Sequence, residues 1–382
     1  MAVAAVSCAA LLAGLGAAAP TAGSTSRENR AATTASCVGW TSVPPPNPGS
    51  ANVLNAVDVL SPSNVWAAGS YDPLGGDPTK ALVEHWDGTS WTAWGLGQGV
   101  LRGVAALSRT NVWVVGYSLS HLSSRAIQTA HWDGTAWKVV AVPRHTGILY
   151  GVAAVSAANI WAVGNGGALH WNGTAWKHVS TPVPGGVLLA VDASSPTHVW
   201  AVGYSGDDRA KTLVLRWNGT RWRRVASPNP AGTAAGNLNV LDGVTAISRH
   251  NVWAVGYDAS VTSGSRKTLI EHWNGKRWRR VASPNPGDPN GTLGTSLGSS
   301  LGGVAASSAS DVWAVGEYGT ASGVLTLTAR WNGAAWKQVA SPSPVLAGVT
   351  NDYLNAVAAT SAVNVWAVGS IFFDETLAIH HC

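Results

Sequence analysis

The sequence predicts an all-β protein, a seven-bladed β-propeller of four-stranded antiparallel blades whose ring is closed when the N-terminal strand completes blade seven. Three observations predict this fold: a recurring motif, a constant order of strand-like segments within each repeat, and complementary chain ends. A repeat of about 50 residues is typical of propellers and solenoids. The motif is Val-Trp-Ala-Val-Gly with small changes, and its tryptophans are Trp66, Trp113, Trp161, Trp200, Trp253, Trp313 and Trp366.

Each repeat contains four short runs of β-branched and aromatic residues, separated by turn residues. In the fifth repeat they are Leu241–Ser248, Val252–Gly256, Ile270–Trp273 and Trp278–Val281, which we name strands A to D. Strand B is apolar at nearly every position, as expected for a strand buried on both faces between neighbouring blades. The Asn-Gly or Asp-Gly pair between strands C and D predicts a hairpin of type I′, in which both central residues have positive φ.

The loop lengths predict one uniform face and one variable face. The valine of strand A and the tryptophan of strand B are always nine residues apart, as in Val57 and Trp66. The tryptophans of strands C and D are five residues apart, as in Trp86 and Trp91. The B–C and D–A connections instead vary in length from repeat to repeat. Because function tends to lie on variable loops held by a rigid scaffold, we expect it on the B–C/D–A face.

The two chain ends complement each other. Blade seven lacks a fourth strand at the C-terminus, and the segment that begins at Cys37 supplies it. His381 then takes the place of the strand C tryptophan, and Trp40 that of the strand D tryptophan. We predict a Cys37–Cys382 disulfide that closes the ring; the alternative is two unpaired thiols. Such a bond matches an oxidising compartment.

The N-terminal residues indicate a targeting segment. Residues 2–19 carry no charge and consist mostly of Ala, Leu, Val and Gly. We expect a secretory signal peptide at 1–22, a flexible linker at 23–36 and the propeller at 37–382. Cys8 would leave with the signal peptide. The protein would then be secreted and extracellular, with no membrane span after signal removal; the alternative for this segment is a membrane anchor.

The composition excludes two classes of protein. The 382 residues include 24 Lys and Arg against 19 Asp and Glu, and only 11% are charged. With 21 tryptophans the chain is too apolar for a disordered protein. A net charge of +5 spread over this length argues against a dedicated nucleic-acid binder, so we expect no nucleic acid partner.

The unit Val252–Gly256, followed by a loop and by Ile270–Val281, resembles a kelch repeat. In that family a strand B that ends in Gly precedes a strand C that ends in an aromatic residue, a short turn, and a strand D that opens with Trp. The resemblance covers residues 37–382, with one Gly per repeat where the family has a pair, and it extends to repeat proteins secreted by actinobacteria. WD40 is the alternative, because Trp86-Asp87 and Trp132-Asp133 echo its signature.

The resemblance raises the question of enzymatic chemistry. The kelch-like group includes the central domain of galactose oxidase, whose relatives bind copper through Tyr and His and carry a Cys–Tyr cross-link. This chain offers no such cluster and, if its ends are bridged, no free thiol. We therefore expect no enzyme, no catalytic residue, no metal and no cofactor. The basic residue before each strand C tryptophan is expected to make a structural hydrogen bond, with metal binding as the alternative, and the recurring Ser-x-x-Asn is expected to cap turns.

The remaining candidates lie near the variable loops. Aromatic rings beside carboxylates suit sugars, by stacking on C–H faces and accepting hydroxyl hydrogen bonds. The predicted ligand-binding residues are Tyr117, Tyr204, Asp207, Asp208, Tyr257, Asp258, Asp352 and Tyr353. We expect a monomeric, non-catalytic binding module for a glycan or cell-wall polymer. The alternatives are a protein–protein interaction scaffold, ordinary loop polarity, or an enzyme with a loop-borne site.

A separate feature is basic. Two arginine pairs, Arg223-Arg224 and Arg279-Arg280, follow the strand D tryptophans of adjacent repeats. They could form an outer stripe for an anionic polymer. Alternatively, they solvate an edge strand and discourage edge-to-edge pairing.

Overall fold

The computed structural model describes residues 39–118, 128–206, 210–262, 266–287, 298–344, 350–372 and 374–382. The chain separates into two units, Met1–Cys37 and Val38–Cys382. The first unit, with the expected signal peptide at 1–22 and linker at 23–36, lies outside the described residues. Within the described ranges, no helical segment has the length and apolar character needed to cross a bilayer.

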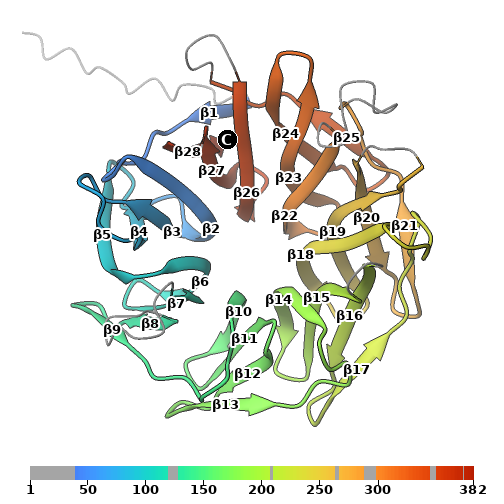
Figure 1. The fold of residues 1–382 in the computed structure, drawn as a ribbon, viewed down its shortest axis with the longest axis horizontal. Coiled ribbons are helices and arrows are strands. Elements are labelled where there is room, and N and C mark those ends of the chain that lie inside the picture. Colours follow the sequence, from blue (N-terminus) through green and yellow to red (C-terminus); the bar gives the residue numbers. More distant parts are fainter. Residues whose placement is uncertain are drawn as a thin grey trace, which may run out of the picture. The chain divides into compact units, whose positions relative to one another are not determined.

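Five of the sheets contain four antiparallel strands each, in sequence order from the central channel outward (Figure 1). The first three are blade 1, β2 (Ala51–Ser61), β3 (Asn64–Asp72), β4 (Lys80–Trp86) and β5 (Trp91–Gln98); blade 2, β6 (Val100–Ser108), β7 (Asn111–Tyr117), β8 (Thr129–Trp132) and β9 (Trp137–Val139); and blade 3, β10 (Leu149–Ser156), β11 (Asn159–Gly164), β12 (Gly167–Trp171) and β13 (Trp176–Val179). The other two are blade 4, β14 (Val187–Ser195), β15 (His198–Ser205), β16 (Lys211–Trp217) and β17 (Trp222–Val225); and blade 5, β18 (Leu238–Ser248), β19 (Asn251–Ala259), β20 (Arg266–Trp273) and β21 (Trp278–Val281).

A further sheet of eight strands divides into two groups of four. Blade 6 is β22 (Ser299–Ser308), β23 (Asp311–Thr320), β24 (Gly323–Trp331) and β25 (Trp336–Val339), and blade 7 is β26 (Thr350–Ser361), β27 (Asn364–Ile371), β28 (Glu375–His381) and β1 (Trp40–Ser42). A short parallel pairing of β24 with β26 joins the two groups. The strands therefore follow the seven predicted repeats, and the innermost strands contact one another around the ring, including β26 with β2.

The core lies between the blades because each strand B tryptophan packs against the next blade. Trp161 of blade 3 lies 4.8 Å from Trp217 and 5.2 Å from Trp222, measured between ring centroids. The second of these contacts is edge-to-face, the arrangement that the quadrupoles of the rings favour. Because both faces of strand B are covered in this way, all its residues from Ile160 to Gly164 are buried, as the continuous apolar run predicts.

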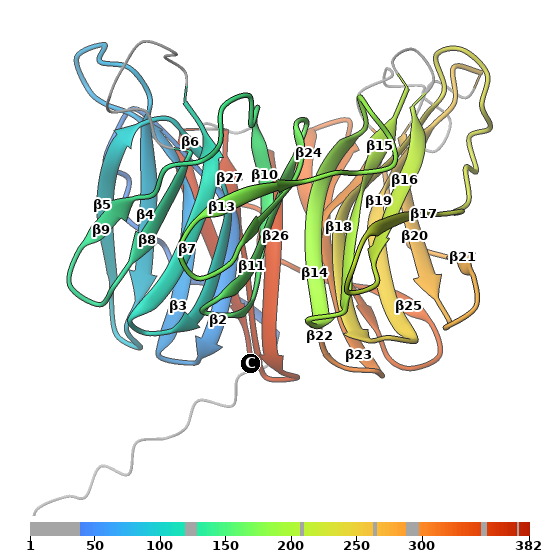
Figure 2. The ribbon, with the colours of Figure 1, turned by 90° about the horizontal axis from the view of Figure 1, so that it is seen from below.

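The turns form one uniform face and one variable face, as predicted from the spacings (Figure 2). Every A–B turn runs from a serine to an Asn, Asp or His three residues later. In blade 5 the Ser248 hydroxyl accepts the amide of His250 at 3.2 Å, so the recurring serine caps a turn, as expected. The B–C and D–A loops lie at the opposite end of the strands.

The C–D hairpins are present, but the predicted type I′ geometry is wrong. In blade 4 the Asn218 side chain accepts the amides of Thr220 and Arg221 at 3.1 and 3.0 Å. Only Gly219 has a positive φ, of 97°, whereas a type I′ turn needs two such residues. The loop contains four residues rather than two, and the Asn is selected for its hydrogen bonds rather than for a left-handed backbone.

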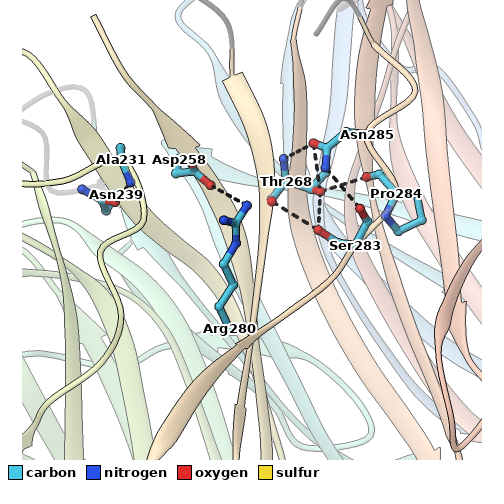
Figure 3. A network of polar contacts seen from close by, with 8 residues as sticks. All are labelled: Ala231, Asn239, Asp258, Thr268, Arg280, Ser283, Pro284 and Asn285. Atoms are coloured by element: carbon cyan, nitrogen blue, oxygen red, sulfur yellow. Dashed lines mark hydrogen bonds and ion pairs between the residues drawn. The ribbon is translucent and has the colours of Figure 1, made fainter. Parts of the chain in front are cut away.

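Strand β1 completes blade 7 in the predicted register. Trp40 is paired with His381, as Trp222 is paired with Trp217 in blade 4. The Thr376 amide donates to the side chain of Asn47 at 2.7 Å, which repeats the bond of Thr268 to Asn285 (Figure 3). Cys382 is disulfide-bonded. Its predicted partner, Cys37, lies outside the described residues.

Candidate functional site

A β-bulge near the start of every strand A directs one residue into the central channel. In blade 5, Leu241 pairs with Gly256 and Gly243 pairs with Val255, so that Asp242 is the extra residue between them. The same shift occurs in all seven blades. The bulge residues are Asn55, Arg102, Tyr150, Leu189, Asp242, Gly302 and Asn355.

The glycine of the Val-Trp-Ala-Val-Gly motif is required by this bulge. A Cβ added to Gly256 would lie 2.1 Å from the carbonyl oxygen of Val240. The corresponding glycines of the other blades meet the same obstacle, for example Gly203 against Val187 at 2.0 Å. Real Cβ atoms do not approach an oxygen so closely, so the motif keeps glycine where the bulged strand presses against strand B.

The seven bulge residues and their neighbours line a channel cavity of about 180 Å³. On one side the residues are joined by hydrogen bonds between blades. The Asn355 amide donates to the Leu54 carbonyl at 2.8 Å, and the Asn55 amide to the Leu101 carbonyl at 2.9 Å. Arg102 then donates to the Asn55 side chain at 3.3 Å. The bulge residues therefore connect blades 7, 1 and 2 by hydrogen bonds. The bulge residues of the other four blades differ in type.

A second ring lies one step nearer the B–C/D–A face. It consists of the residue that follows the motif glycine on strand B. Its members are Ser70, Tyr117, Asn165, Tyr204, Tyr257, Glu317 and Ser370. The preceding glycine is constant while these residues differ in size, charge and polarity. Six of these side chains are partly or fully exposed, whereas Ser370 of blade 7 is buried. The fold thus places side chains of different chemistry at the end of the channel where the long loops lie.

Four tyrosines from the two rings form what we call the tyrosine arc: Tyr117, Tyr150, Tyr204 and Tyr257. Burial raises the pKa of Tyr150, and the nearby Tyr204 and Tyr117 raise it further. The guanidinium of Arg102 lies 6.0 Å from the centroid of the Tyr117 ring. The arc therefore runs from blade 2 to blade 5 as a set of half-buried rings with hydroxyls near one another.

The charged part of the channel end lies beside the arc, in blades 5 and 6. Burial and the neighbouring Glu317 raise the pKa of Asp242 to about 7. Ser300 donates a hydrogen bond to Glu317, whose own pKa burial raises. Arg266 opposes both shifts and stacks on the Tyr257 ring at 4.8 Å. A cavity of about 190 Å³ is lined by Arg266, Ser300, Glu317 and Tyr353, among others.

A larger cavity, of about 720 Å³, opens between blades 2 and 3 on the same face. Tyr117 lines it, and so do the polar side chains of Gln128, His145 and Asn165. His145 has a φ of 63°, a left-handed conformation that is uncommon for a residue other than glycine. Backbone strain of this kind clusters at ligand sites. Tyr117 belongs both to this cavity and to the tyrosine arc.

The structure brings together part of the predicted site. Tyr117, Tyr204 and Tyr257 occupy equivalent positions in the second ring, and Tyr353 lines the smaller cavity beside Glu317. Asp207 and Asp208 lie outside the described residues. The binding role of these residues stays a prediction.

Two of the predicted acidic residues are placed differently from the expectation. Asp258 lies on β19 rather than in the B–C loop, is 7% exposed, and faces Arg280 at 3.7 Å (Figure 3). Asp352 lies within β26 rather than before it and is fully buried. Burial raises the pKa of Asp352 to about 6. Neither carboxyl is presented to a ligand in this arrangement, because strand alternation turns each of them away from solvent.

Six of the seven basic residues before the strand C tryptophans make structural hydrogen bonds, as expected. The seventh, Arg216, differs: its guanidinium lies over the Trp200 ring, 5.4 Å from the centroid. His85 bonds to the side chain of Asn64 at 2.9 Å, and the same oxygen accepts the Trp66 indole N–H at 3.0 Å. In blade 6 Arg330 and Asp311 replace the histidine and the asparagine, and they form an ion pair. Among the residues that the structure describes, no group of three or more His, Cys, Asp or Glu is arranged to hold a metal ion.

Comparison with known proteins gives similarity at the level of the fold. No family model and no curated protein matches the chain. The solved structure of U3-55K superposes with a TM-score of 0.59 at 12% identity, covering 90% of this chain and 98% of that one. YCF48 from Cyanidioschyzon merolae gives 0.55 at 15% identity, covering 90% and 99%. The WD40 repeats of RRP9 give 0.57 at 12% identity, covering 89% and 99%. The chain is a β-propeller.

The repeats of the propeller carry a sequence signal for some of the site residues and none for others. WD40 and kelch propellers share four-stranded blades, so this likeness concerns the architecture alone. Arg102, Tyr150 and Asp242 each follow the leucine of strand A, and an alignment of the seven repeats with one another would have shown that this position varies between constant neighbours. Gln128 and His145 carry no such signal, because they lie in connections that differ from blade to blade.

Proposed function

We propose that this propeller is a secreted, non-catalytic binding module that recognises a glycan or cell-wall polymer on its B–C/D–A face. The observation that carries the proposal is the position of Tyr117, which lines the 720 Å³ cavity and also begins the tyrosine arc. A ligand seated against Tyr117 would therefore extend toward Tyr150 and Tyr204 at the end of the channel.

The chemistry around Tyr117 supports a neutral, hydroxyl-rich ligand. The ring supplies a flat apolar surface, and Gln128 and Asn165 place amide groups in the same cavity. One atom of each amide is bonded to the backbone, since Gln128 Nε2 donates to the Gly147 carbonyl and Asn165 Oδ1 accepts from the Ile148 amide. The cavity volume falls within the range of about 300–1,000 Å³ typical of small-molecule sites. Half-buried tyrosines lose little conformational entropy on binding, which favours them as contact residues.

The residue types that recur in every blade support a binding role rather than catalysis. The serines cap turns, and the histidines are held by asparagines, so both are used by the scaffold. We propose that the repeats are kelch-like, because the strand C and strand D tryptophans recur with a period longer than that of WD40 repeats. For the partners, we propose no nucleic acid and a monomeric state.

The first experiment is a binding assay of the purified, oxidised protein against a panel of neutral glycans and isolated cell walls. We expect saturable binding that Tyr117→Ala weakens at least tenfold, because the substitution removes the stacking surface from the cavity. A tenfold loss corresponds to about 1.4 kcal/mol. The matched control is Leu74→Ala, which removes a 78% exposed side chain from a B–C loop of the same face outside the cavity.

Three results would contradict the proposal. The first is a folded protein that binds no glycan or cell wall. The second is Tyr117→Ala binding as tightly as the unaltered protein. The third is an equal loss in Leu74→Ala, which would indicate non-specific adhesion to the face.

A protein-interaction scaffold is the second candidate. Leu74 and Val261 are 78% and 61% exposed and both lie in B–C loops, so the same face also presents apolar side chains. Cross-linking in the native secreted fraction would test this candidate. Cross-links that map to this face and persist in Tyr117→Ala would favour a protein partner over a glycan.

We also propose that Cys37 is the disulfide partner of Cys382. The chain holds three cysteines, so the alternative partner is Cys8. Support comes from the register of β1, in which Trp40 is paired with His381 as Trp222 is paired with Trp217. Counted along the sequence from these pairs, Cys382 and Cys37 correspond to two adjacent residues of the blade 4 turn, Asn218 and Gly219. A disulfide also supports secretion, because such bonds persist in oxidising compartments.

A further inference from the structure

Basic residues are concentrated in two adjacent blades. Of the 24 lysines and arginines, 13 lie between residues 187 and 287, the segment that forms blades 4 and 5. The two blades carry arginines at the same places, on the outermost strand and in the turn that precedes it. We call six of these residues the basic strip: Arg221, Arg223, Arg224, Lys276, Arg277 and Arg279, all of which are exposed.

The two halves of the strip lie on the outer edges of neighbouring blades. Its arginines flank Trp222 and Trp278 on β17 and β21, the outermost strands of neighbouring sheets (Figure 1). The ring of Trp200 in blade 4 lies 5.4 Å from that of Trp278, and the guanidinium of Arg216 lies 5.4 Å from the same Trp200 ring. This buried tryptophan contact joins β21, which carries one half of the strip, to β15 of blade 4, the blade that carries the other half.

The charges of the strip are not neutralised. None of its six residues forms an ion pair with a described acidic side chain. On the outer strand of blade 2, Lys138 meets Asp133 at 2.6 Å, and within blade 5 Arg280 meets Asp258 at 3.7 Å. Lys177 of β13 and Lys337 of β25 are like the strip in forming no ion pair with a described acidic side chain. The described carboxyls of blades 4 and 5 are instead half-buried or buried, in the channel or inside the blades.

Protection of an edge strand does not account for the strip. Blade 1 has Thr92 and Ala93 at the positions of Arg223 and Arg224, and blade 7 has Thr41 and Ser42, so an outer strand of this fold needs no charge there. In blade 4, Arg223 also stands directly opposite Arg216 on the neighbouring strand. Like charges at such a pair of positions are destabilising. The arrangement has a cost that the fold does not require.

We propose that the basic strip of blades 4 and 5 is a docking site for a flexible polyanion whose charges are phosphodiesters, of the polyol-phosphate kind. Arginine matches phosphate because its planar guanidinium can donate two parallel hydrogen bonds. The strip lies on the outer edge and on the side of the uniform turns, away from the tyrosine arc, so it is a second site. Its tryptophans, Trp222 and Trp278, are only 3% and 5% exposed and offer no surface on which nucleic-acid bases could stack.

The test uses poly(glycerol phosphate) of defined length, with the affinity of the oxidised protein measured over a range of salt concentrations. The variant combines Arg223→Thr, Arg224→Ala and Arg279→Thr, which installs the residues found at these positions in blade 1. We expect the affinity at low salt to fall at least tenfold. The slope of log affinity against log salt should fall by about two, because each phosphate that an arginine neutralises on a flexible strand adds roughly 0.7 to that slope.

The matched control is Lys138→Thr, at the same position of blade 2, where the charge is already paired with Asp133. It should leave the affinity and the salt slope unchanged. Single-stranded DNA and polyglutamate of equal charge are the competing probes, and both should bind more weakly than the polyol phosphate. Unchanged binding by the triple variant, an equal loss in Lys138→Thr, or equal binding of DNA or polyglutamate would each overturn the proposal.

Discussion

At the scale of single residues, the repeats act as internal controls for one another. Two residues before the strand A leucine, blades 1 and 5 carry buried asparagines. The Asn52 side chain accepts the Gly49 amide N–H and donates to the Gly49 carbonyl. The Asn239 side chain accepts the Ala231 amide N–H and donates to the Gly232 carbonyl, each at 3.0 Å. These amides fasten the D–A loops to the blades. Blade 7 has Asp352 at this position, and a carboxylate cannot donate the hydrogen bonds that the amide provides.

Asp352→Asn is therefore expected to raise the free energy of unfolding at neutral pH. The fold holds the pKa of Asp352 at about 6, above its ordinary value of 3.8, so the native state binds this proton more tightly than the unfolded chain does. The stabilisation that this tighter proton binding gives to the native state is fully present below about pH 4 and is lost as the pH rises through 6. The loss amounts to at most about 3 kcal/mol. Urea unfolding from pH 4 to 8 measures the effect. The free energy of unfolding of Asp352→Asn, relative to that of the unaltered protein, should increase as the pH rises.

The control for this prediction is Asp77→Asn, which changes an exposed carboxyl in a B–C loop. Its difference from the unaltered protein should not grow across this pH range. A gain in Asp352→Asn that is the same at pH 4 and pH 8 would contradict the role assigned to the proton.

At the scale of elements, the bulge on strand A and the glycine on strand B form one unit. Gly256→Ala would place a methyl group 2.1 Å from the Val240 carbonyl, so strand A could not keep its extra residue. We expect a loss of about 3 kcal/mol or more in unfolding free energy, the range of severe backbone conflicts. Chemical unfolding measures it. Gly75→Ala, which adds its methyl group to open space at a φ of 100°, should lose only about 1 kcal/mol. Equal losses in the two variants would disprove the close contact.

The elements also show how far the sequence could predict the structure. The strand order, the two faces and the completion of blade 7 follow from spacing, because a turn of fixed length fixes the register of its strands. The C–D turn type could not be predicted, since Asn-Gly is common to hairpins with two-residue and four-residue loops. The burial of Asp258 and Asp352 depends on where each strand begins. The strands extend further into the loops than turn residues such as Gly and Asn suggest.

At the scale of the whole molecule, the fold depends on a strand from one end pairing with a strand from the other. We expect Cys37→Ser to lower the free energy of unfolding by about 2–5 kcal/mol, because the unfolded chain is then no longer constrained by the disulfide. Thermal unfolding with and without a reductant measures the effect. Cys8→Ser is the control and should behave as the unaltered protein does. The reverse pattern would assign Cys8 as the partner of Cys382.

The pairing of β1 with β28 also sets a time at which the ring can close. Thr41 and His380, which bond across this pair, are 339 positions apart in the chain. A ribosome therefore releases the second partner long after the first. Until then blade 7 has no outer strand, and the neighbouring Trp313 lacks the Trp40 ring that packs against it. Contacts this distant in sequence are formed late and slowly. Closure is therefore an event that follows the synthesis of all seven repeats, and a nascent propeller remains open for as long as their translation lasts.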